Sequence, residues 1–188
     1  MNQLAKSMAS LAVCAVSCAM SMQASAQSWP SHIIKAVIPF GAGSATDVVP
    51  RAVFDRMSAE LGQTIVVENR TGAGGSLGTG VVAHAAPDGY TILAHSSALV
   101  IAPSLYPNLT YDVTKDLSSA LMLGTSVSVM ITPTSRPWKT VQEFLTAAKA
   151  KDAAITYGSV GIGSATHIAA EKFRIAAGFA ATHVPYRG

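Results

Sequence analysis

Three segments of the sequence place glycine, serine and threonine directly after a short apolar run and before a helical pattern. A turn of this kind exposes main-chain N–H groups at the first turn of a helix, where the positive end of the helix dipole favours a bound anion. Carboxylates and phosphates are the anions that suit this chemistry. The three segments are 41–47, 69–76 and 158–167.

Each glycine-rich segment follows a predicted strand that is short, apolar and rich in β-branched residues. Charged residues are sparse in the chain, at 12%, which favours a parallel sheet buried on both faces. The carboxyl ends of parallel strands meet at one edge of such a sheet, and ligands bind there in open α/β folds. The three strands are expected at 33–39, 64–68 and 154–157.

The helix after the first turn is expected to begin at Thr46 or Asp47, because both side chains are good N-caps. Its apolar residues recur at helical spacing on one face, and Gly62 is expected to end it. These apolar residues are Val49, Val53, Met57 and Leu61. The order strand, helix, strand implies two parallel strands joined by a right-handed crossover.

The remaining elements divide into two groups, which we assign to two α/β lobes. The first lobe, 27–120, is completed by a helix over 77–86, a strand over 90–94 and an irregular connection over 102–118. Residues 121–188 are assigned to the crossover and the start of the second lobe, and an alternating apolar run over 121–132 is expected to make the crossing. A capping box at 140–143 opens the first helix of the second lobe. A helix from 140 to about 150, a helix over 166–177 and a strand over 181–186 follow.

The first 26 residues are predicted to be a cleavable signal peptide. Lys6 supplies a positive n-region, 11–20 forms an apolar h-region, and Ala24-Ser25-Ala26 is an A-x-A cleavage signal. Both cysteines, Cys14 and Cys18, lie inside this segment, so the mature chain has no thiolate chemistry and no disulfide. Cleavage after Ala26 predicts a periplasmic protein.

Composition and spacing argue against several other classes. The formal net charge is only +3 and no run of basic residues occurs, so nucleic acid is not expected as a partner. The five histidines show no metal-ligand spacing, so no metal site is expected. No nucleophile motif and no carboxylate pair is evident, so we predict that the chain is not an enzyme and uses no cofactor.

The order and spacing of these motifs resemble those of the substrate-binding proteins of tripartite tricarboxylate transporters, also called Bug-type or TctC-type receptors. The resemblance runs from about Trp29 to Gly188. It implies an α/β fold of the type II periplasmic-binding-protein class, with two Rossmann-like lobes that close on a small carboxylate. Members of this family are about twice as long, which implies a second lobe that is incomplete in this chain. The matching pieces include Leu61-Gly62-Gln63, Gly72-Ala73-Gly74-Gly75, Ala86-Pro87-Asp88-Gly89-Tyr90, Pro103-Ser104-Leu105-Tyr106 and Val184-Pro185-Tyr186-Arg187-Gly188.

The resemblance also implies which residues bind the carboxylate, through main-chain N–H groups, hydroxyls and bridging waters. One loop from each lobe contributes, and the serines at the end of the strand 90–94 and the turn 72–76 are expected to line the same cleft. The candidate ligand-binding residues are Phe40, Gly41, Ala42, Gly43, Ser44, Thr46, Ser96, Ser97, Ser159, Gly161, Gly163, Ser164, Thr166 and His167. Asp47, Gly74 and Gly75 are expected to support the loops, and Arg70 and Arg187 are candidates for attracting the carboxylate. The expected partners are a small organic carboxylate and the membrane subunits of such a transporter, with the receptor itself a monomer.

The first loop departs from the family pattern, because Gly41-Ala42-Gly43-Ser44 stands where Pro-Pro-Gly-Gly often follows the phenylalanine. Loss of the prolines predicts a more flexible loop. Two alternatives stay open: an exported α/β enzyme acting on a small carboxylate, and a truncated receptor without function. The segment 41–46 also nearly fits a dinucleotide-binding fingerprint, although Thr46 replaces its third glycine.

Overall fold

The computed structural model describes residues 28–186, so the predicted signal peptide, Arg187 and Gly188 lie outside the described residues. Residues from His32 onward form one compact unit. Within this unit, two separate parallel sheets are present, one of three strands and one of two. Among residues 28–186, no helix is long and apolar enough to cross a membrane.

The first sheet consists of β1 (Ile34–Ile38), β2 (Ile65–Asn69) and β3 (Thr91–Leu93), in the order β2-β1-β3. Both neighbours pair with β1 in parallel, as the strand–helix–strand pattern predicted. The central strand is the most buried, with Ile34, Val37 and Ile38 at most 1% exposed. The carboxyl ends of the three strands therefore meet at one edge of the sheet.

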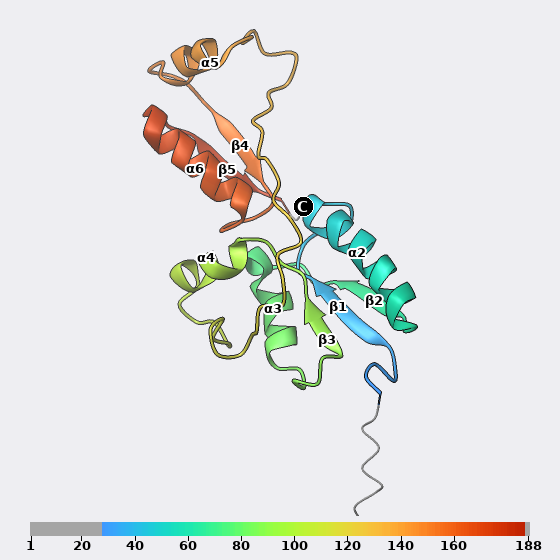
Figure 1. The fold of residues 1–188 in the computed structure, drawn as a ribbon. Helices are drawn as coiled ribbons and strands as arrows, with labels where there is room; N and C mark the ends of the chain where they lie inside the picture. The colour runs from blue at the N-terminus through green and yellow to red at the C-terminus, as the bar shows by residue number, and fades with distance from the viewer. Residues whose placement is uncertain (1–27, 187–188) are drawn as a thin grey trace, which may run out of the picture. The chain divides into compact units, whose positions relative to one another are not determined.

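Helices α2 (Ala45–Leu61) and α3 (Ser76–Ala83) connect these strands, and a short 3₁₀ turn, η2 (Ala73–Gly75), precedes α3. Across the sheet, the chain moves from β1 to its neighbour β2 on one side, and then back past β1 to β3 on the other side. Right-handed crossovers in opposite directions place the two helices on opposite faces of the sheet, as Figure 1 shows. The core between α2 and the sheet is formed by Ala36, Ile38, Phe54 and Ala94.

Two expectations about α2 were wrong. Its N-cap is Ser44, not Thr46 or Asp47, because Gly43 adopts a left-handed φ of 84° and the next residue is extended with φ −69° and ψ 161°. Its fully buried residues are Asp47, Pro50 and Phe54; of the predicted apolar face, Val49 is 49% exposed, whereas Met57 does pack against the core. The helix does end at Gly62, which is left-handed with φ 63°, as predicted.

The expectation of an irregular connection over 102–118 was wrong at its beginning. Helix α4 (Ala98–Leu105) includes the first four of these residues, with Pro103 inside it. Proline in the last turn of a helix removes a single N–H donor, and burial of Ala98 and Ala102 compensates for that loss. The two prolines at 103 and 107 therefore did not prevent a helix here.

The second sheet pairs β4 (Thr156–Ser159) with β5 (Thr182–Pro185), and α5 (Val141–Ala148) and α6 (Ala165–Ala177) accompany it. The N-cap half of the predicted capping box is confirmed, because Thr140 Oγ1 accepts a hydrogen bond from the Glu143 main-chain N–H at 3.2 Å. The Glu143 carboxylate accepts from the Lys139 N–H at 2.6 Å, one residue before the N-cap. The Phe144 ring packs against those of Phe173 and Phe179, with centroids 6.3 and 5.5 Å away.

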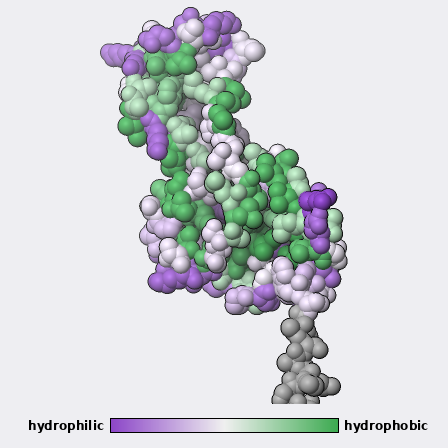
Figure 2. All heavy atoms as spheres, viewed as in Figure 1, coloured by the Kyte–Doolittle hydropathy of each residue, from purple (hydrophilic) through white to green (hydrophobic). Residues whose placement is uncertain are grey.

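The segment 117–133, within which a crossing between lobes was predicted, contains neither helix nor strand. Val127, Val129 and Ile131 are 90%, 77% and 87% exposed, because no strand among residues 28–186 pairs with this segment. Apolar side chains are consequently spread over the surface, as the green areas of Figure 2 illustrate. The division into lobes at residue 120 stays a prediction.

Candidate functional site

The loop after β1 is held by a buried carboxylate. Asp47 is 2% exposed and lies in the first turn of α2, where its Oδ2 accepts a hydrogen bond from the Gly43 main-chain N–H at 2.8 Å. Arg51 Nε donates to Oδ1 at 2.9 Å, and Asn69 Nδ2 donates to the same oxygen at 2.8 Å. Asp47 therefore ties the Gly43 turn to helix α2 and to the end of strand β2.

These donors keep the Asp47 carboxyl ionised. The hydrogen bond from Arg51 is the largest influence, and those from Asn69 and Gly43 add to it, so the pKa of Asp47 falls from 3.8 to about 2 despite burial. Asn69 also donates to the main-chain oxygen of Phe40 at 2.9 Å. The loop 40–47 thus has an internal support that leaves its first helical amides, Ala45 and Thr46, without a main-chain acceptor among residues 28–186.

The loop after β4 repeats this construction with different side chains. Ser164 is the extended N-cap of α6 and its Oγ accepts a hydrogen bond from the His167 main-chain N–H at 3.2 Å. The His167 ring reaches back, and its Nδ1 accepts from the Gly163 N–H at 3.2 Å. His167 therefore takes the place in this loop that Asp47 takes in the first, without a negative charge.

Ser159 was expected in the ligand-binding loop, but it is the last residue of β4 and only 7% exposed. Its pairing with Pro185 of β5 extends the strand further than the sequence suggested. The Ser159 Oγ contacts both main-chain polar atoms of Gly161, each at 3.1 Å, and lies 2.7 Å from His183 Nε2. Ser159 thus shapes the loop from its buried end.

The glycine-rich turn after β2 approaches the loop after β4 closely. A Cβ atom added to Gly74 would lie 2.4 Å from the Ile162 main-chain oxygen, and one added to Gly163 would lie 2.8 Å from Leu105 Cδ1. Tyr106 Oη donates a hydrogen bond to the same Ile162 oxygen at 3.2 Å. Glycine is needed at positions 74 and 163, both for this approach and for their positive φ angles of 63° and 81°.

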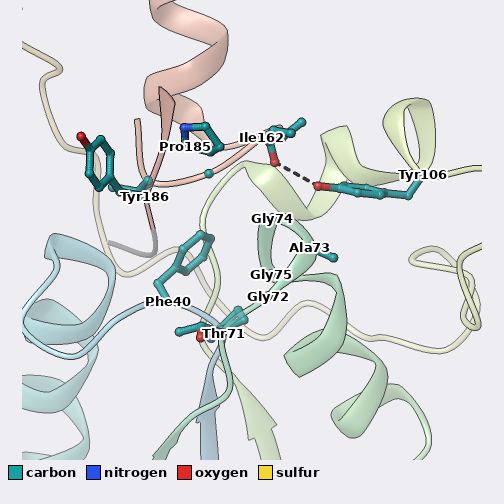
Figure 3. Close-up of a pocket in the computed structure, with 13 residues that line it drawn as sticks. Phe40, Thr71, Gly72, Ala73, Gly74, Gly75, Tyr106, Ile162, Pro185 and Tyr186 are labelled. Carbon is teal, nitrogen blue, oxygen red and sulfur yellow. Dashed lines mark hydrogen bonds between the residues drawn. The ribbon is translucent and has the colours of Figure 1, made fainter. Parts of the chain in front are cut away.

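A cavity of about 300 Å³ opens where these loops meet. Figure 3 shows the aromatic rings of Phe40, Tyr106 and Tyr186 around it, with the Gly72–Gly75 turn forming one wall. No charged side chain lines it among the described residues. The full lining is Pro39, Phe40, Thr71, Gly72, Ala73, Gly74, Gly75, Tyr106, Val160, Gly161, Ile162, Pro185 and Tyr186.

The predicted site residues divide into three groups in the structure. Of the ligand-binding candidates, Phe40 and Gly161 line the cavity, as do the loop-support candidates Gly74 and Gly75. Those in 41–46 and 163–167 form the two loops beside it, and no hydrogen bond joins the two loops within residues 28–186. Ser96 accepts from His95 Nδ1 at 2.9 Å through its main-chain oxygen, and Ser97 precedes α4; neither lines the cavity.

Several residues of this region were missed by the sequence analysis as site candidates. Tyr106 and Tyr186 line the cavity. Both lie in motifs that carry the family resemblance, and this was the signal that could have identified them as site candidates. Asn69 ends β2 at the binding edge of the sheet, so its position could have been inferred from the strand pattern. The partner of His183 depends on the pairing register of two strands, for which the sequence carries no local signal.

The predicted attraction by Arg70 is not supported by its contacts, because its guanidinium pairs with Glu68, which Lys35 also contacts at 3.0 Å. Among residues 28–186, no group of three or more histidine, cysteine or acidic side chains is placed to hold a metal ion.

Comparison with known proteins gives the same family as the motifs. The model of the tripartite tricarboxylate transporter family receptor matches residues 49–188. A Pseudomonas protein, described as the UPF0065 protein in the tcbD–tcbE intergenic region, is 35% identical over 160 residues, which cover 85% of this chain and 48% of that protein. The chain thus spans about half the length of the curated relatives it matches.

Solved structures agree in fold. The periplasmic binding protein BugD has a TM-score of 0.72 at 32% identity, over 85% of this chain and 54% of that one. A Rhodopseudomonas palustris protein with adipate has a TM-score of 0.69 at 26% identity, with the same coverages. MatC from Rhodopseudomonas palustris, with bound malate, has a TM-score of 0.63 at 27% identity, over 85% of this chain and 55% of that one. The predicted periplasmic-binding-protein fold is confirmed, and the chain belongs to the receptor family of tripartite tricarboxylate transporters.

Proposed function

We propose that this chain captures a small organic carboxylate in the periplasm for a tripartite tricarboxylate transporter. The observation that carries the proposal is the pair of loops at the strand ends, 40–47 and 159–167, each of which contains an extended serine N-cap. Two helices of 17 and 13 residues begin at these serines. Their first-turn amides supply hydrogen-bond donors and a positive dipole end to an anion.

The cavity suits a carboxylate with an apolar chain better than a phosphorylated compound. Within residues 28–186, its lining carries main-chain groups of glycines, the hydroxyl groups of two tyrosines and the Phe40 ring, and no lysine or arginine. A carboxylate bears one negative charge per group, which amides and hydroxyls can satisfy, whereas a phosphate dianion usually recruits arginine. Asp47 does not oppose the ligand, because its charge is already neutralised by Arg51.

The relatives support this class of ligand. Two structures of similar fold were determined with adipate and with malate, and a third is a periplasmic binding protein. We propose that the transporter's membrane subunits are the partners and that the chain acts as a monomer. The predicted absence of catalysis belongs to the same proposal.

Titration calorimetry of the purified protein with adipate and malate tests this function, with adipamide as the uncharged match. We expect saturable binding of at least one dianion and none of adipamide, because the diamide lacks the charge that the helix ends attract. Ser164→Trp should abolish binding, since Ser164 is 1% exposed and a bulky ring would displace the loop. Ser118→Trp, at an exposed position outside the site, is the control.

Absence of binding for a panel of mono-, di- and tricarboxylates would overturn the proposal, provided that the protein unfolds cooperatively. The enzyme alternative is examined on the same samples. Conversion of a bound acid, followed by proton NMR over hours, would favour it, and an unchanged spectrum would favour the receptor.

A further inference from the structure

Strand β5 presents one side chain that the proposed function does not use. His183 pairs in register with Tyr157 of β4, so both side chains lie on the same face of the two-stranded sheet. Ser159 lies two residues further along β4 and shares that face. Helix α6 packs against this face, because the Tyr157 hydroxyl donates to Glu171. His183 is therefore positioned among side chains of three different elements.

The His183 ring contacts two other rings and a hydroxyl group. It stacks on the Tyr157 ring with centroids 4.9 Å apart and on the His167 ring with centroids 4.1 Å apart. Its Nε2 lies 2.7 Å from the Ser159 Oγ. Stacking fixes the plane of the imidazole and the hydrogen bond fixes its rotation, so this side chain has a single orientation.

Hydrogen bonds lead from His183 directly into the loop that is proposed to hold the carboxylate. The Ser159 Oγ contacts the N–H and the carbonyl oxygen of Gly161, and the same Gly161 oxygen accepts from the Ser164 N–H at 3.2 Å. Gly161 has a φ of 118°, a conformation that needs such support, and it lines the cavity. Ser164 then caps α6.

From this chain of contacts we infer that His183 is a positioning residue of the carboxylate site, acting through Ser159 on Gly161. The inference rests on the proposed function for its effect on binding, but its effect on the loop exists without a ligand. The groups that face His183 are Tyr157 and Ser159 from β4, and His167 and Glu171 from α6. Burial is the largest influence on His183 and lowers its pKa, which favours the neutral ring.

Two substitutions separate the hydrogen bond from the stacking. His183→Phe keeps an aromatic ring against Tyr157 and His167 but has no polar atom for Ser159. His183→Gln gives up the stacking but carries an amide that reaches the place of Nε2 and does not titrate. We expect His183→Phe to weaken adipate binding about tenfold, the effect of one lost hydrogen bond in a buried network, and His183→Gln to restore most of that loss.

The ligand-free readout is the amide ¹H–¹⁵N resonance of Gly161 in the full chain. It should move in His183→Phe and stay near its wild-type position in His183→Gln, whether or not adipate binds. If wild-type protein binds none of the panel of mono-, di- and tricarboxylates but Gly161 responds in this way, the proposed function fails and the positioning role stands. An unmoved Gly161 resonance in His183→Phe, or a glutamine variant as impaired as phenylalanine in both readouts, overturns the inference.

Discussion

Replacement of Asp47 by asparagine is the sharpest test of how the first loop is built. The carboxylate accepts hydrogen bonds from Gly43, Arg51 and Asn69 at 2.8 to 3.0 Å and is 2% exposed. Asparagine has nearly the same shape, but it carries no charge and places an NH₂ group where a carboxylate oxygen accepted. The substitution therefore removes the electrostatic contribution while leaving the packing volume unchanged.

The magnitude follows from the pKa of Asp47. A fall from 3.8 to about 2 means that folding stabilises the ionised carboxyl relative to the neutral one by about 2.4 kcal/mol, compared with the unfolded chain, at about 1.36 kcal/mol per pKa unit. An NH₂ group facing a donor adds an unsatisfied contact, so the expected loss in the free energy of unfolding is about 2–4 kcal/mol. The same substitution should weaken adipate binding, because the Gly43 turn loses its anchor.

Urea denaturation followed by circular dichroism measures this loss, with Asp55→Asn on the exposed side of α2 as the control. The sign of the pH dependence is fixed by the depressed pKa. The contribution of Asp47 is fully present above pH 3.8 and is lost as the pH falls through about 2. Wild type and Asp47→Asn should therefore converge as the solution is acidified. A difference below about 1 kcal/mol at neutral pH, or one that does not shrink in acid, would refute the reasoning.

Three further outcomes are expected. Gly74→Ala should weaken adipate binding, because the added Cβ would lie 2.4 Å from the Ile162 main-chain oxygen. A Cβ added to Gly43 would meet no atom within 4 Å, so Gly43→Ala should show only the cost of a left-handed alanine. Equal losses of affinity for the two variants in calorimetry would contradict this. Thr140→Ala removes the side-chain cap of α5 and should lower the free energy of unfolding by about 1 kcal/mol. An unchanged midpoint of urea denaturation would argue that Thr140 does not cap this helix. Burial lowers the pKa of both His95 and His183. The stability that they contribute is therefore present above pH 6.5 and is lost as the pH falls below it. A urea midpoint that does not change with pH across this range would count against their burial.

Strands and parallel topology were predictable because their signals are local. A short β-branched run that stops at proline or glycine needs no knowledge of the rest of the chain, and β1, β2 and β3 lie within one residue of expectation at most ends. Helix α4 was not predictable in this way, since Pro103 is a helix breaker by propensity and only tertiary burial of Ala98 and Ala102 offsets it. The buried face of α2 depends likewise on Phe54 meeting the sheet.

For the site, the sequence indicated which loops matter and that Asp47 supports the first of them. Glycine and serine in 41–47 and 158–167 carry a local signal, because a left-handed turn before an N-cap requires those residue types. Further contacts come from other elements: Asn69 from β2 donates to Asp47, and His183 from β5 contacts Ser159. Such pairings depend on strand order and register, which become apparent only in the folded chain.

The two loops also differ in how they tolerate an anionic ligand. In the first, the side chain that reaches back to the turn is a carboxylate, and its charge must be compensated by Arg51 within the same helix. In the second, the corresponding side chain is the His167 ring, whose Nδ1 accepts from the Gly163 N–H. A dianion held between them would meet a support without a carboxylate on one side and a charge-compensated carboxylate on the other. Substitution of Arg51 should therefore weaken binding even though Arg51 does not line the cavity, because it would leave the Asp47 charge uncompensated beside the ligand.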